Sequence, residues 1–344
     1  MKVTGPPVGE YTPIRIADHE VQQPAPEQTP PLPDPDPKPL GQVRIGLHAA
    51  ADPDISDEEI VEFGLFRPNI IKVLSFHNPV ALRKLAQNHP DAKWVARAFL
   101  DLGGRSISPQ KFFNDTISDM KRTMDILHDR DVVIELHNEP NIVPEGLESA
   151  WTNETDFATW WLRLLHLYRY IFPDQRFIYP GLSPGAEVYR LKQDHIRFLE
   201  ASRAAFNAVD GLGIHLYWSV HTPMDQALKG LDDTISRFRN TPIWVTEASN
   251  NKGGTTASDK AYQYLSFWKE LQKRPIVEGI TYLWLQQETL TSAKRYLWAR
   301  ECHASLALAK NNNDPIVKFD EVIRCSTVLR IHYTFIQNSY KKTG

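Results

Sequence analysis

Short apolar runs rich in β-branched residues alternate with helix-type patterns along most of this chain, and this alternation constrains the fold most. Helix start signals follow the runs, for example Ser56 with Glu59 three residues later, or Asn78-Pro79. Strands that alternate with helices build parallel sheets. Eight runs predict an α/β fold, a (β/α)8 TIM barrel. The predicted strands are Val43–His48, Ile70–Leu74, Trp94–Leu100, a run starting at Val132, Phe177–Pro180, Gly211–Trp218, a run ending at Glu247, and Ile280–Trp284.

The segments between these runs predict seven clear helices. The segment after the fifth run predicts a helix from about Glu187 through Leu199. The last unit is the least regular, because residues 285–310 have the pattern of a long loop with helical pieces. Asp320–Tyr333 is the candidate for the eighth helix.

The sequence divides into residues 1–40 and residues 41–344. The first part is dense in proline, as in Pro30-Pro31-Leu32-Pro33, and such a stretch lacks the backbone donors that helices and sheets need. We expect it to be an extended arm or linker, which would join the barrel to an additional module. A proline-rich ligand for another domain is the alternative. Residues 41–344 are expected to form the catalytic domain, with a poorly defined C-terminal segment.

Composition narrows the classes of partner. A formal net charge of −3 over 344 residues gives no electrostatic case for nucleic acid. No apolar run approaches the 18 or so residues that cross a bilayer, so no membrane span is expected. The start, Met1-Lys2-Val3-Thr4, lacks the apolar core of a signal peptide. The sequence as given therefore indicates a cytoplasmic protein, or a secreted one whose leader has been removed.

Two of the predicted strands deliver a glutamate at their carboxyl ends. The run from Val132 ends in Asn138-Glu139-Pro140, and a later run ends at Glu247. In α/β barrels the chemistry lies at the carboxyl ends of the strands. Cleavage of a glycosidic bond uses two carboxylates, one that carries a proton and one that is ionised. The alternative for Glu139 is a structural carboxylate in the turn before Pro140.

Asn138-Glu139, His215-Leu216-Tyr217, Glu247 and Trp284 follow one another on successive predicted strands. This ordered set resembles the clan A retaining glycoside hydrolases, the (β/α)8 group that includes the family 5 cellulases and mannanases. The resemblance implies that Glu139 is the acid/base and Glu247 the nucleophile. The chain departs from family 5 on strand 2, where those enzymes carry an arginine and this chain has Lys72.

The same resemblance implies roles for the neighbouring residues. Asn138 would bind the sugar 2-hydroxyl, and Tyr217 would donate a hydrogen bond to Glu247. His215 and Tyr217 are two residues apart on one strand, so they share a face, either at the barrel mouth or as a core pair. Trp284 would form the floor under the sugar ring, because an aromatic face matches the C–H face of a pyranose. Arg97 is expected to be a polar group of the barrel interior or of a sugar subsite.

Further sugar units would lie against tryptophans in or beside the loops at the barrel mouth. Trp218, Trp151 and Trp298 are the candidates. The substrate class that follows is an oligo- or polysaccharide with β linkages. The identity of the sugar, and internal against terminal cleavage, stay open at this point.

Two other functions fit the same fold. A metal-dependent hydrolase is one, because His48, His137 and His215 lie near strand ends, but none of them forms a His-x-His pair. A non-catalytic sugar-binding barrel is the other, and it would keep the tryptophans while losing a carboxylate. Both glutamates are present, so the sequence favours a glycosidase that needs no metal or other cofactor.

Overall fold

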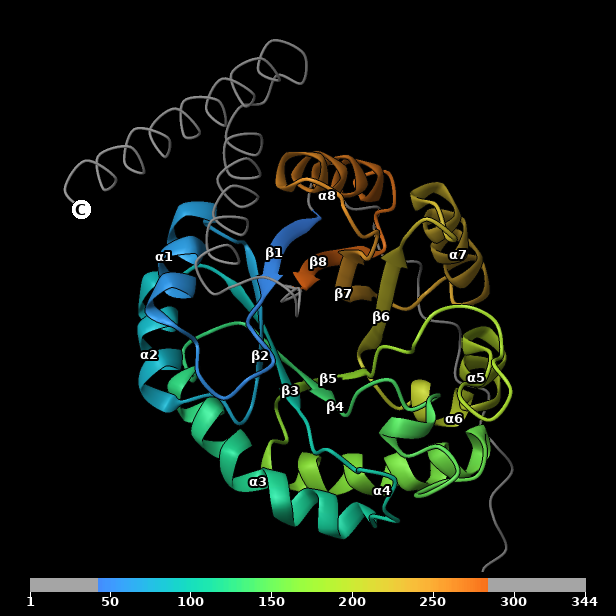
Figure 1. Cartoon of the computed structure of the whole chain (residues 1–344). Helices are drawn as coiled ribbons and strands as arrows, with labels where there is room; N and C mark the ends of the chain where they lie inside the picture. Colours follow the sequence, from blue (N-terminus) through green and yellow to red (C-terminus); the bar gives the residue numbers. More distant parts are fainter. Residues whose placement is uncertain (1–42, 284–344) are drawn as a thin grey trace, which may run out of the picture. The chain divides into compact units, whose positions relative to one another are not determined.

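The computed structural model of the protein describes residues 43–283, which form a closed barrel of eight parallel strands (Figure 1). Each strand pairs with its neighbours in the sequence, and β1 pairs with β8 to close the sheet. The predicted TIM barrel is therefore confirmed. The strands are β1 Arg44–His48, β2 Ile70–Leu74, β3 Lys93–Ala98, β4 Val132–Leu136, β5 Arg176–Tyr179, β6 Gly211–Trp218, β7 Ile243–Asn250 and β8 Val277–Leu283.

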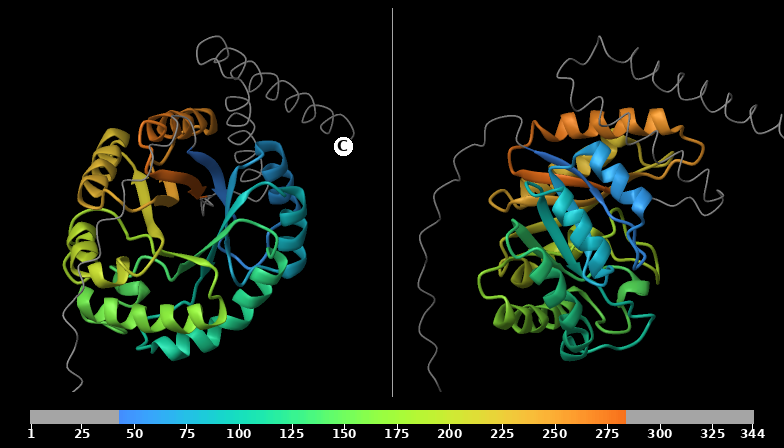
Figure 2. Two further views of the ribbon diagram at one scale, coloured as in Figure 1. Left: turned by 180° about the vertical axis from the view of Figure 1, so that it is seen from behind. Right: turned by 90° about the vertical axis from the view of Figure 1, so that its left-hand side faces the viewer.

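Helices surround the strands, as the views from behind and from the side show (Figure 2). Within residues 43–283, none of them is long and apolar enough to cross a membrane. The helices are α1 Asp57–Phe66, α2 Pro79–Asn88, α3 Pro109–Ile126, α4 Glu154–Ile171, α5 His195–Ala201, α6 Arg203–Phe206, α7 Met224–Arg237 and α8 Ala257–Leu271, with a 3-10 turn at Val143–Glu145.

Several predictions fall on parts of the chain that the structure does not describe. The proline-rich arm of residues 1–40, the sugar-floor residue Trp284, the loop tryptophan Trp298 and the candidate eighth helix Asp320–Tyr333 all lie outside the described residues. They stay predictions.

The start of α1 follows its sequence signal. The Ser56 hydroxyl accepts the backbone N–H of Glu59 at 3.1 Å, as an N-cap should. The Glu59 carboxylate in turn has the backbone N–H of Ser56 as a hydrogen-bond partner, as in the predicted capping box. It also accepts the backbone N–H of Ala50 at 2.7 Å, so Glu59 ties the helix to the segment after β1.

The segment after β5 differs from the helix that the sequence predicts there. α5 begins at His195, and the residues before it form a loop that includes the bridge between Val188 and Lys192. The side-chain amide of Asn141, from the segment after β4, donates to the carbonyls of Ser183 and Gln193 and accepts from the Ser183 N–H. This buried amide thus holds the loop before α5 against the segment after β4.

The interior of the barrel has an apolar layer below a polar one. The apolar layer consists of Ile70, Val95, Val133, Ile178 and Trp244. Because side chains on one face of a strand recur every second residue, the next inward positions lie closer to the carboxyl ends. Those positions on four strands carry polar groups, so the polar layer is Lys72, Arg97, Glu135 and Thr246.

Close packing between β1 and β2 depends on a glycine. A Cβ added at Gly46 would lie 1.5 Å from the carbonyl oxygen of Ile70, whereas one added at Gly64, on the exposed side of α1, would have no atom within 4 Å. We expect Gly46→Ala to lower the free energy of unfolding by about 1–3 kcal/mol or more through overpacking. Gly64→Ala should raise it by about 0.5–1 kcal/mol through helix propensity.

Denaturant unfolding of both variants measures this difference. Equal effects of the two substitutions would contradict the described approach of β1 to β2.

Candidate active site

Glu139 reaches the barrel mouth through an unusual turn after β4. His137 and Glu139 have φ values of 79° and 35°, in the left-handed region that residues other than glycine rarely adopt. The Glu139 N–H donates to the Gly181 carbonyl at 3.0 Å, which holds the turn against the segment after β5. Strained backbone of this kind persists only where the surroundings enforce it, and it is frequent at functional sites.

Glu247 reaches the same mouth through an irregularity in β7. The register with β6 shifts between Ile214, which pairs with Val245, and His215, which pairs with Glu247. Thr246 is the extra residue, as in a β-bulge. As a result Thr246 and Glu247 both turn inward, since Thr246 donates to Glu135 and Glu247 contacts Lys72.

His215 and Tyr217 on β6 connect the two glutamates. His215 Nδ1 lies 2.8 Å from Glu139 Oε1 and 3.3 Å from the Tyr217 hydroxyl, and this hydroxyl donates to Glu247 Oε2 at 2.6 Å. This chain of contacts limits the separation of the two carboxylate oxygens to at most about 9 Å, a distance over which a pair of carboxylates can act on one glycosidic bond. Of the two alternatives for His215 and Tyr217, the structure has the barrel mouth.

The two ring nitrogens of His215 face different groups. Arg97 Nη2 lies 3.2 Å from His215 Nε2. Nδ1 faces Glu139 and lies 2.8 Å from its Oε1. His215 therefore orients the carboxylate of Glu139 and is itself positioned by Arg97.

Glu247 lies among positive charges. Arg97 Nη2 is 2.6 Å and Lys72 Nζ 3.3 Å from its Oε1. Burial by itself would raise the pKa of Glu247, but His215, Arg97 and Lys72 together hold this pKa well below its usual value. Glu247 is consequently ionised at neutral pH, as a nucleophile must be.

Glu139 has a different environment. Its side chain is 14% exposed, and within residues 43–283 neither Lys72 nor Arg97 forms an ion pair with it. The preceding residue, Asn138, donates its amide to Glu145 Oε1 at 2.9 Å, while its Oδ1 is buried and has no hydrogen-bond partner among the described residues. Burial raises the pKa of Glu145 to about 7, against the effect of the Asn138 hydrogen bond. Asn138 thus presents an unpartnered oxygen next to Glu139.

Two predicted sugar-binding residues, Trp218 and Arg97, pack against other side chains of the protein. Trp218 is 3% exposed, stacks on Phe267 of α8 and donates to Gln263, so it packs between the barrel and the helices. Its alternation with Tyr217 turns it away from the carboxylates, but Trp218 also lines the cavity beside the site, so sugar binding by Trp218 stays a prediction. Arg97 is the interior polar group of the two possibilities, because its side chain contacts Glu135, Glu247 and His215.

Trp151 is not free to stack on a sugar. It is 3% exposed, its indole N–H donates to the Pro140 carbonyl, and its ring contacts His137 and Trp160. The tryptophan therefore supports the turn that carries Glu139.

Sequence reasoning did not single out two carboxylates of this site, Glu135 and Glu145. Glu135 had a usable signal, since it is a charged residue in the middle of the apolar run Val132–Leu136. A charge inside a buried strand requires a partner, and Lys72 and Arg97 occupy comparable positions on the neighbouring strands. Glu145 had no such signal, because it lies in the short turn Val143–Glu145, outside every predicted strand.

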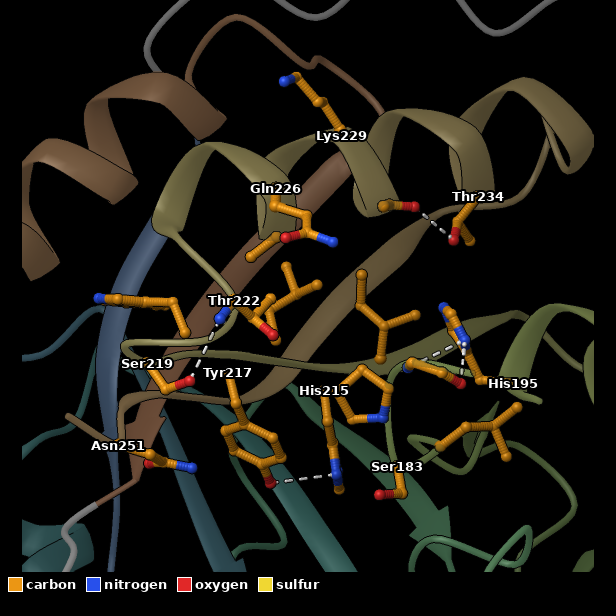
Figure 3. Close-up of a pocket in the computed structure, with 18 of the residues that line it drawn as sticks. Ser183, His195, His215, Tyr217, Ser219, Thr222, Gln226, Lys229, Thr234 and Asn251 are labelled. Atoms are coloured by element: carbon orange, nitrogen blue, oxygen red, sulfur yellow. Dashed lines mark hydrogen bonds between the residues drawn. The ribbon is translucent and has the colours of Figure 1, made fainter. Parts of the chain in front are cut away.

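A cavity of about 600 Å³ lies beside the site (Figure 3). It is bounded by β6, α7 and the segment before α5. His215 and Tyr217 line it together with Ser183 and Gln226. Its volume is in the range of small-molecule binding pockets.

The three histidines near strand ends do not converge on one point. His137 packs against Phe112, Trp151 and Trp160, whereas His48 and His215 each lie 3.7 Å from Glu247 Oε1. In the described part of the chain, residues 43–283, no three His, Cys, Asp or Glu side chains are grouped as metal ligands.

Solved structures with a similar fold include glycoside hydrolases. Bacteroides uniformis beta-glucuronidase 2, covalently bound to cyclophellitol-6-carboxylate aziridine, is 12% identical with a TM-score of 0.54, over 80% of this chain and 36% of that chain. A family 39 glycoside hydrolase from Bacteroides cellulosilyticus WH2 is 14% identical with a TM-score of 0.51, over 76% of this chain and 63% of that one. This chain thus spans about a third of the glucuronidase and less than two thirds of the family 39 protein. At these identities the likeness concerns the fold.

A family model gives the chain its classification. No curated protein matches the chain. Residues 110–305, more than half of its length, match the model described as the glycosyl hydrolase catalytic core. The match includes Glu139, the His215-Leu216-Tyr217 stretch and Glu247, and it begins after Lys72 and Arg97. Because the model covers most of the barrel and both glutamates of its mouth, the chain belongs to the glycosyl hydrolase catalytic core family.

Proposed function

We propose that this protein is a retaining glycoside hydrolase that cleaves β-linked glycans, with Glu247 as nucleophile and Glu139 as acid/base. The observation that carries the proposal is the unequal surroundings of two carboxylates that His215 and Tyr217 link. Glu247 has two cations and a tyrosine hydroxyl around it, whereas Glu139 has the imidazole of His215 as its partner. Two carboxyl groups whose environments differ in this way can divide the acid and nucleophile roles.

In the first step, an oxygen of Glu247 attacks the anomeric carbon while Glu139 gives its proton to the leaving oxygen. The electron pair of the broken C–O bond stays with that oxygen, and Glu247 becomes a neutral ester. In the second step, Glu139 takes a proton from water, which displaces Glu247 from the sugar. His215 holds Glu139 in place throughout, and Tyr217 does the same for Glu247.

Neighbouring residues complete the proposed site. Asn138 binds the sugar 2-hydroxyl in this proposal, a contact that strengthens in the transition state, and its buried Oδ1 has no other hydrogen-bond partner among the described residues. Trp284 stays the predicted floor under the sugar. In this proposal residues 41–344 are the catalytic domain, residues 1–40 are a linker to an additional module, and the substrate is an oligo- or polysaccharide.

Removing either carboxylate tests the assignment. We expect Glu139→Gln and Glu247→Gln each to lower kcat by about 10²- to 10⁴-fold on aryl β-glycosides and on any polysaccharide that the wild type cleaves. Glu148→Gln is the control, because Glu148 is an exposed glutamate in the segment after Glu139. Near-normal kcat in both site variants would sink the proposal.

The stereochemistry of the product tests the double displacement separately. We expect the anomeric configuration of the first-formed sugar to be the same as that of the substrate, because two inversions restore it. Proton NMR during early turnover measures it. An inverted product would show that water attacks directly, and Glu247 would then be a base.

The Tyr217 hydroxyl stabilises the ionised form of Glu247, so its loss should raise the pKa of that carboxylate. We expect Tyr217→Phe to move the acidic limb of the kcat/KM profile to higher pH by about one unit. Tyr170→Phe, an 84% exposed position on α4, should leave the profile unchanged. An unmoved limb in Tyr217→Phe would mean that the hydroxyl does not act on Glu247.

A further inference from the structure

Glu135 is a carboxylate at the centre of the barrel that the proposed reaction does not use directly. It lies on β4, is fully buried, and its partners within residues 43–283 are all groups that can donate a hydrogen bond. Lys72 Nζ and Arg97 Nε lie 2.7 Å and 2.8 Å from its Oε2. The Gly181 N–H and the Thr246 hydroxyl donate to its Oε1 at 3.1 Å and 2.9 Å. Four donors from four segments of the barrel therefore hold this one side chain.

The two cations bound by Glu135 are the same two that contact the nucleophile. Lys72 and Arg97 bridge Glu135 Oε2 and Glu247 Oε1. Such a shared contact defines the direction in which each cation points, because one end of the bridge is a rigid strand position. Glu135 therefore acts by orienting Lys72 and Arg97, and it does not contact the substrate itself.

The charges of this cluster balance. Two cations and two carboxylates lie together in the interior, where an unpaired charge is costly. Burial by itself would raise the pKa of Glu135, but Arg97 and Lys72 outweigh this effect and lower it, so the carboxylate is ionised. Removing one carboxylate would leave an excess positive charge a few ångströms from Glu247.

The proposed reaction removes a carboxylate charge at each turnover. When Glu247 forms its bond to the sugar it becomes a neutral ester, and the transition state on the way carries positive charge on the sugar ring. Lys72 and Arg97 would then repel that charge, unless another anion compensates them. Glu135 is the anion that keeps both contacts through the cycle.

We propose that Glu135 is a positioning residue that aims Lys72 and Arg97 at the nucleophile and supplies the fixed negative charge that balances them when Glu247 is neutralised. The inference rests on the proposed function of this site. It adds a buried carboxylate, four residues before the acid/base, to the groups on which the reaction depends.

A charge-matching set of variants tests this role. Glu135→Gln keeps the shape and loses the charge, Lys72→Met removes one cation, and the double variant restores the balance. We expect Glu135→Gln to lower kcat by about 10- to 100-fold with little change in KM, as for loss of other electrostatic groups. The loss in the double variant should be at least about tenfold smaller than the product of the two single losses, because the residues are in direct contact.

The pH profiles provide a readout that a structural role alone would not move. Glu135→Gln leaves excess positive charge near Glu247, so the acidic limb of kcat/KM should move to lower pH. Lys72→Met should move it to higher pH, and the double variant should lie between them. Glu278→Gln is the matched control, because this glutamate contacts Arg44 and Lys93 on strands β1 and β3 away from the mouth.

Three results would overturn the inference: wild-type kcat in Glu135→Gln, independent effects in the double variant, or a lowered Tm with kcat and the acidic limb unchanged. If Glu135→Gln does not fold, Glu135→Asp keeps the charge but shortens its reach, and wild-type kcat there would overturn the positioning role. A wild type without Glu247-dependent hydrolysis would overturn both proposals. Hydrolysis with independent variant effects would count only against Glu135.

Discussion

Two cations and two carboxylates share the interior of this barrel, and the geometry of the mouth depends on their remaining a balanced set. Each buried charge would be costly alone, and each is compensated by a neighbour at hydrogen-bonding distance. Lys72 and Arg97 lie between Glu135 and Glu247, so no member of the set can move without exposing a charge on another. The constraint explains why the Glu247 carboxylate has a defined orientation.

The apolar layer under this cluster makes its interactions strong. Ile70, Val95, Val133, Ile178 and Trp244 fill the barrel below the charges and exclude water from that side. In a medium of low polarity a given separation of charges corresponds to a larger interaction energy than in water. Inward-facing side chains recur every second residue along each strand, and this period produces both the apolar layer and the polar layer above it.

The two glutamates of the mouth differ because different elements surround them. Glu247 lies on a strand, within reach of the cations that β2 and β3 carry. Glu139 lies beyond the end of β4 in a left-handed turn and has His215 as its partner. Since Arg97 contacts the other nitrogen of that imidazole, the charged cluster also positions the ring that Glu139 contacts. Both environments thus derive from one network.

Local patterns in the sequence were sufficient for the barrel and for two of the strands near Glu139 and Glu247, although β7 continues past Glu247 to Asn250 and does not end there as predicted. Apolar period and cap residues are properties of neighbouring residues, so they can be read without coordinates. They were insufficient where a contact with a residue far away in the sequence decides the local structure. The first part of the predicted helix from Glu187 is a loop that Asn141 holds, and α5 begins only at His195. Trp218 turns toward Phe267 of α8.

The sequence by itself determined the order of strands and helices and the residue types at the barrel mouth, because these depend on local periodicity. Tertiary structure decided how those residues meet. The extra residue Thr246 in β7 turns Glu247 inward, and the register with β6 that makes this possible is a property of two strands together. The pairing of Glu135 with Lys72 and Arg97 likewise requires three strands side by side, and the parallel pairing of β2, β3 and β4 creates that arrangement.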